Sequence, residues 1–179
     1  MTDVAGNRAP AAALPEVWLR GPLDGFDPIV MPAAHALLQS AEDLERAASL
    51  LTRDELWARP GGAASVGFHL QHVAGTIDRL LTYARGEQLD AAQLAALKAE
   101  KDPGAHASDA DALIAGAVRA IQRAVETLRD TPRDSLFEKR FVGRKQLPTT
   151  VWGLLFHIAE HTQRHTGQVI TTSKIVRGE

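Results

Sequence analysis

Three of the seven histidines in this chain, His157, His161 and His165, fall within one short stretch near its C-terminal end. Residues four apart on an α-helix lie one above the other, with Cβ atoms about 5–6 Å apart, so two such imidazoles could reach one metal ion. The three positions also share a narrow arc of the helix surface. The spacing therefore predicts a metal site on a C-terminal helix, with either His157 and His161 or His161 and His165 as the ligand pair.

A second helix must complete this site, because two histidines are too few to hold zinc. An earlier helical stretch offers His69 and His72. His72 lies on the predicted apolar face with Phe68 and Leu80, whereas His69 points partly away. Three imidazoles and an open position are typical of catalytic zinc, which lowers the pKa of a bound water to about 7. Imidazole also suits nickel, iron and copper, so the donor type does not identify the metal.

Two other interpretations of the histidines compete with this one. His157 to His161 matches the H-x-x-E-H pattern of inverted zinc proteases, with Glu160 as the general base. That family uses a further acidic ligand downstream, and here Glu179 is the only acid after His161. Glu160 also has Arg164 four residues on, as a surface ion pair would. The alternative without metal is a polar seam in which the histidines bond to Gln71, Gln163 and Gln168.

The composition excludes several classes of function. With 179 residues the chain is long enough for one domain with a core, and a formal charge of −2 gives no sign of nucleic-acid binding. The sequence has no cysteine, which excludes disulfides, thiolate zinc sites and a cysteine nucleophile. It has no apolar run long enough for a membrane span and no signal peptide, so we expect a cytoplasmic protein.

Apolar residues at helical spacing predict the elements that must position the histidines. Four long helices are expected from about residues 32 to 51, 65 to 85, 108 to 131 and 150 to 173. Ser65 and Thr149 or Thr150 are predicted helix caps, and Ser108 with Asp111 a capping box. A short helix, capped by Asp90, is expected over 91–101, and 133–148 is irregular with a possible hairpin. The pattern predicts an all-α four-helix bundle, in which metal sites form between facing helices.

The N-terminal part is predicted to lie outside the bundle. Residues 1–26 are expected to be a flexible tail followed by an extended arm, and 27–179 the bundle domain. Apolar side chains of the arm region should pack on the body: Trp18, Leu19, Phe26 and Ile29.

Both histidine segments together resemble the DinB/YfiT-like superfamily. The matching stretches are Gly67 to Leu81, which contains His72, and His161 to Val169, which contains H-x-x-x-H followed by Gly-Gln. The resemblance covers about residues 27–175. It implies an up-down-down-up four-helix bundle, often a homodimer, with a metal held by His72, His161 and His165. His157 matches a frequent extra histidine of the family.

The resemblance implies a metal-dependent enzyme acting on a small molecule, as a thiol S-transferase or a hydrolase. Zinc is the expected divalent metal, with nickel or iron as alternatives, and a low-molecular-weight thiol is a possible substrate. Neither a nucleic acid nor a membrane is an expected partner. Catalysis would rest on a bound water or substrate thiolate, with Glu160 and His157 as further candidates. A non-catalytic metal-binding or stress-response bundle is the alternative, and an H-x-x-E-H metalloprotease a remote one.

Overall fold

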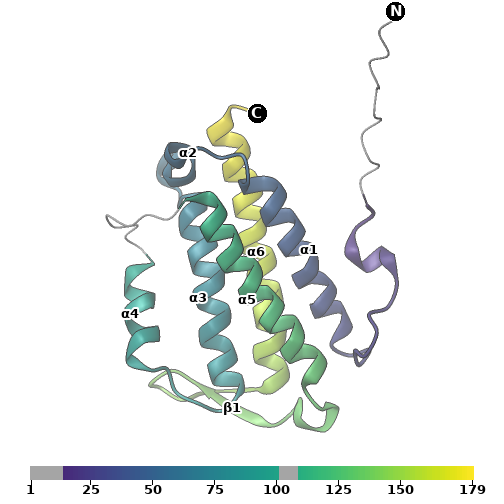
Figure 1. Cartoon of the computed structure of the whole chain (residues 1–179). Coiled ribbons are helices and arrows are strands. Elements are labelled where there is room, and N and C mark those ends of the chain that lie inside the picture. Colours follow the sequence, from purple (N-terminus) through teal and green to yellow (C-terminus); the bar gives the residue numbers. More distant parts are fainter. Residues whose placement is uncertain (1–13, 101–108) are drawn as a thin grey trace, which may run out of the picture.

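Four long helices form the body of the computed structural model, which describes residues 14–100 and 109–179 (Figure 1). They are α1 (Met31–Ala48), α3 (Val66–Ala84), α5 (Ala110–Asp130) and α6 (Val151–Arg177). Residues 1–13 of the predicted tail and arm, and the predicted cap Ser108, lie outside the described residues. In the described part, no helix is both long and apolar enough to cross a membrane.

The helices follow the predicted up-down-down-up order. α1 and α6 run in one direction, and α3 and α5 run in the other (Figure 1). Each of α3 and α1 packs against both α5 and α6. Because α3 and α5 run in the same direction, the chain that connects them must travel back along the length of the bundle, from the end of α3 to the start of α5. The short helix α4 (Ala91–Ala99) makes part of this return, lying outside the bundle beside α3 (Figure 1).

Leucine and isoleucine side chains fill the space between the four helices. Leu37 and Leu44 of α1, Leu70 of α3, Ile121 of α5 and Ile158 of α6 are almost completely buried. Burying one such side chain contributes about 1.5–3 kcal/mol. Buried residues recur every three or four positions, as Leu37, Ser40, Leu44 and Ala48 do in α1. This spacing fixes which face of each helix turns inward and, with it, where the histidines point.

Polar caps begin the helices where the sequence predicts, with one exception. The side chains of Ser65, Asp90 and Thr150 accept hydrogen bonds from backbone N–H groups of α3, α4 and α6. The predicted capping box at the start of α5 is wrong: the cap is Asp109, whose Oδ1 accepts from Ala112 N at 2.9 Å. An aspartate caps as well as a serine, so composition alone does not separate adjacent candidates.

A β-hairpin joins α5 to α6, within the segment predicted to be irregular with a possible hairpin. Strands β1 (Lys139–Val142) and β2 (Leu147–Thr150) pair antiparallel, with Lys139 opposite Thr150. The turn uses positive φ angles at Gly143 and Gln146. β2 runs directly into α6, so the cap Thr150 is both the last strand residue and the start of the histidine-bearing helix.

The arm before α1 packs differently from the prediction. Trp18 and Leu19 are 61% and 56% exposed, whereas Val17 is buried. The arm forms a 3-10 turn, η1 (Val17–Arg20), and this turn directs only Val17 toward the body. The prediction for Phe26 is confirmed, and Ile29 likewise packs against the core. A further short helix, α2 (Arg53–Trp57), follows α1.

Candidate metal centre

Three histidines from two adjacent helices converge at the edge of the core. His72 of α3 and His161 and His165 of α6 each offer one ring nitrogen, and these nitrogens all lie within 4.8 Å of one another. His72 Nε2 is 3.1 Å from His161 Nε2, and the ring centroids of His161 and His165 are 4.5 Å apart. The structure thus brings together the three residues that the family resemblance implied as ligands, with His161 and His165 rather than His157 and His161 as the pair on α6.

Burial keeps two of these imidazoles neutral. Burial lowers the pKa of His161 to about 4, and the nearby His72 adds to the effect. Burial also lowers the pKa of His165 to about 4, with His161 the next cause. At neutral pH both rings therefore hold one proton and keep one nitrogen lone pair, as metal binding requires.

The spacing and chemistry of this group suit a divalent ion. Zinc–nitrogen distances of about 2.0–2.1 Å place two ligand nitrogens about 3.3 Å apart in a tetrahedral site. The 3.1 Å between the Nε2 atoms of His72 and His161 is close to that value. Among residues 14–100 and 109–179, no fourth histidine or carboxylate meets the same distance criterion. The donor set therefore fits an ion with three protein ligands.

His69 is a fourth histidine at this place, and sequence reasoning underrated it. Its side chain is buried, and its Nδ1 lies 3.0 Å from Nδ1 of His165. Burial lowers its pKa, with His72 the second cause. The expectation that His69 points partly away is wrong, because α6 crosses α3 closely enough to cover both His69 and His72. The sequence does contain a signal for this contact. His69 and His72 lie three apart on one helix, and His161 and His165 lie four apart on the other, so each helix offers two histidines on about the same face.

His157 and Glu160 lie beside the histidine group without joining it. His157 is exposed, and its Nδ1 is 2.6 Å from Glu160 Oε1. Glu160 also accepts a hydrogen bond from Arg164 at 2.7 Å, so the predicted ion pair is confirmed. Burial opposes the charge of Glu160, yet the bonds from Arg164 and His157 hold its pKa below the usual value.

Glu100 is a contact that sequence reasoning missed. It follows α4 directly, is buried, and its Oε2 lies 2.8 Å from His72 Nδ1. Its Oε1 accepts from Arg79 Nη1 at 2.5 Å. Burial opposes its charge, but the hydrogen bonds from His72 and Arg79 hold the pKa of Glu100 below the usual value. Glu100 is 28 residues from His72, and no spacing rule links a helix end to another helix across such a distance.

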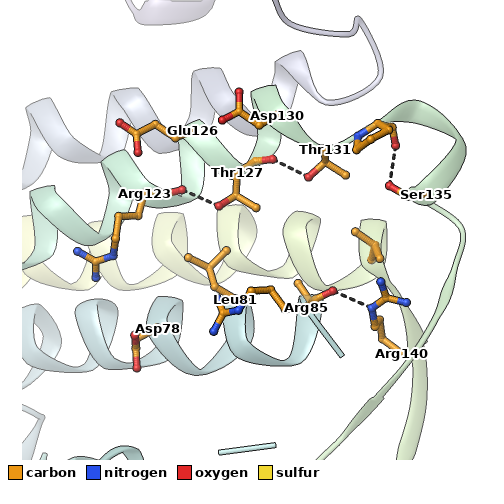
Figure 2. Close-up of a pocket in the computed structure, with 13 residues that line it drawn as sticks. Asp78, Leu81, Arg85, Arg123, Glu126, Thr127, Asp130, Thr131, Ser135 and Arg140 are labelled. Atoms are coloured by element: carbon orange, nitrogen blue, oxygen red, sulfur yellow. Dashed lines mark hydrogen bonds between the residues drawn. The ribbon is translucent and has the colours of Figure 1, made fainter. Parts of the chain in front are cut away.

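A separate cavity of about 610 Å³ opens between the C-terminal parts of α3 and α5 (Figure 2). None of the histidines in the described residues lines it. Many of its polar groups are bonded within the protein: Arg140 donates to Ala84 O, Thr127 to Arg123 O, and Ser135 to a backbone carbonyl (Figure 2). The histidine group therefore remains the site with the clearer chemistry.

Comparisons with known proteins agree with the fold and identify a family. A family model described as the DinB superfamily matches residues 36–169, a range that includes all three converging histidines. One similar solved structure is YfiT from Bacillus subtilis, described as a probable metal-dependent hydrolase with an unusual four-helix bundle topology. The two share a TM-score of 0.62 and 16% identity, over 88% of this chain and 93% of the other. No curated protein sequence matches the chain.

Proposed function

The chain belongs to the DinB superfamily, and from that premise we propose that it is a metal-dependent enzyme whose ion is held by His72, His161 and His165. Its substrate is a small molecule. The observation that carries the proposal is the convergence of three ring nitrogens within 4.8 Å from two adjacent helices. A seam of histidines bonded to glutamine would not need three imidazoles to face one point.

The packing around the group restricts the orientation of its rings. Phe68 stacks on His72, with ring centroids 5.3 Å apart and planes at 10°, and so restricts the rotation of that ring. His161 and His165 are held by α6, which the core residues Leu155 and Ile158 anchor. Three protein donors leave room for a water or substrate donor, which distinguishes a catalytic from a closed structural site.

The first candidate reaction is hydrolysis, because the similar structure YfiT is described as a probable metal-dependent hydrolase. When bound, a divalent ion would lower the pKa of a water or thiol and polarise a substrate oxygen. The second candidate is thiol S-transfer, which the family resemblance implies. The chain has no cysteine, so the thiol would have to come from a substrate.

Metal content tests the ligand assignment. Untagged protein is purified, reconstituted with Zn²⁺ or Ni²⁺, and analysed by elemental mass spectrometry. We expect about one ion per chain in the wild type and its loss in His72→Ala and His161→Ala. His157→Ala is the matched control, because it removes an exposed histidine one turn from His161 and should retain the ion. Full occupancy in His161→Ala, or no ion in the reconstituted wild type, would refute the site.

Activity then separates an enzyme from a non-catalytic metal-binding module. Metal-loaded protein is screened against activated esters and amides, and against electrophiles supplied with low-molecular-weight thiols. An enzyme should give turnover that disappears in His161→Ala and persists in His157→Ala. Stoichiometric metal without turnover on either panel would favour the binding module instead.

A further inference from the structure

We propose that Glu100 is a positioning residue for the metal ligand His72, and that the role of α4 is to deliver it. The inference rests on the proposed function, since it concerns one of the three ligands named there. Glu100 does not face the ion. It contacts Nδ1 of His72, the ring nitrogen that would not bind the ion.

The packing of α4 points to this role. None of its nine residues is buried, and Leu94 and Leu97 are 37% and 39% exposed. The residue that follows the helix, Glu100, is only 8% exposed. A helix that contributes little to the core yet ends in a buried carboxylate is not explained by hydrophobic packing.

The carboxylate of Glu100 sits in a site built to receive it. Arg79 donates to Oε1 and is itself buried, and its Nη2 also donates to Thr76 Oγ1 at 3.1 Å. Gly75 supplies the space: a Cβ at that position would collide with Glu100 Oε1 and lie 2.7 Å from Arg79 Nη1. The remaining oxygen, Oε2, is directed at His72 Nδ1 at 2.8 Å.

This contact determines the tautomer of His72. An ionised carboxylate only accepts hydrogen bonds, so Nδ1, the ring nitrogen that faces Glu100, must carry a proton. The lone pair is then on Nε2, the nitrogen that lies 3.1 Å from His161 Nε2. Carboxylates that hold metal-ligating histidines in this way fix the ring and raise its basicity, and their removal typically costs 10–100-fold in metal affinity.

A second polar contact holds the other end of α4. Gln93 Nε2 donates to Asp78 Oδ2 at 2.7 Å and to Thr82 Oγ1 at 2.8 Å, both on α3. α4 is therefore attached to α3 near its start and at its end. These contacts hold α4 in a fixed position on α3, although none of its own residues is buried.

The test compares Glu100→Ala with Glu160→Ala. Both variants remove a carboxylate bonded to a histidine Nδ1, at 2.8 Å and 2.6 Å, but only Glu100 contacts a proposed ligand. Zn²⁺ affinity is measured by competition with a chromophoric chelator. We expect about 10–100-fold weaker binding in Glu100→Ala and less than a twofold change in Glu160→Ala. Glu100→Gln, whose amide oxygen can still accept from Nδ1, should lose less than Glu100→Ala.

A second measurement, which needs no metal, keeps the inference separate from the proposed function. Nitrogen-15 NMR of the metal-free protein reports the tautomer of His72. The wild type should show Nδ1–H, and Glu100→Ala should show a mixture, with a melting temperature that confirms folding. A wild-type His72 protonated on Nε2, or unchanged Zn²⁺ affinity in Glu100→Ala, would overturn the inference. If the wild type binds no Zn²⁺ but His72 is Nδ1–H, the proposed function fails while the positioning contact stands.

Discussion

His72 differs from His161 and His165 in the partner of its Nδ1 atom. Its Nδ1 meets the carboxylate of Glu100, whereas the Nδ1 of His161 is buried without a partner among the described residues. His165 Nδ1 meets another imidazole, that of His69. The three rings therefore have unequal support, and His72 is the one whose Nδ1 is held by a carboxylate.

Gly75 gives the first prediction at the residue scale. Replacing an exposed helical glycine by alanine stabilises a helix by up to about 1 kcal/mol, and Gly167→Ala in α6 should do so because nothing would contact the new methyl group. Gly75→Ala should gain less or destabilise, because its methyl group would displace the Glu100 carboxylate. Urea unfolding of the metal-free variants measures the difference. Equal stabilisation by both substitutions would show that the carboxylate moves at no cost.

At the scale of elements, the sequence predicts long helices well because apolar spacing and caps agree. The helix of Val66–Ala84 begins after Ser65, and that of Val151–Arg177 after Thr150, as the capping rule requires. The rule fails where two acceptors are adjacent, as with Ser108 and Asp109. It also says nothing about Glu100, because the position of α4 depends on side-chain contacts with α3 rather than on its own pattern.

The start of α5 gives a prediction at this scale. Asp109→Ala removes the cap that binds Ala112 N, and it should lower the free energy of unfolding by about 1 kcal/mol. Asp111→Ala is the matched control. It removes a carboxylate from the same helical turn, so it shares the loss of favourable interaction with the helix dipole but not the loss of the cap. Chemical denaturation of both variants should separate them; similar losses would mean that charge rather than capping matters there.

At the scale of the molecule, the up-down-down-up order determines which helices can share a site. α3 and α6 are neighbours, so His72 and His161 meet although 89 residues separate them. The contact between His72 and His161 could be predicted from the sequence because both residues lie on helices whose apolar faces are clear, whereas the buried position of His69 could not. The homodimer suggested by the resemblance stays a prediction, which sedimentation velocity can test.

The neutral histidines predict a pH dependence of the stability of the whole molecule without metal. The pKa values of His161 and His165 are about 4 in the folded protein, below the 6.5 of an unfolded chain. The unfolded state therefore binds more protons between these values, and stability should fall as the pH drops from about 6.5 toward 4. Melting temperatures in the presence of a chelator measure this between pH 7 and pH 5. The double variant His161→Gln, His165→Gln should show a flatter profile; an equally steep one would assign the effect to other groups.

The division of the histidines between two distant segments also affects how the protein acquires its ion during biosynthesis. At about 5–20 residues per second, a ribosome needs roughly 4–18 s to pass from His72 to His161. Throughout that interval the nascent chain carries only one of the three proposed ligands. An ion can be captured at this site only after α6 has left the ribosome and packed on α3, so metal loading reports that both helices have been made and have packed together.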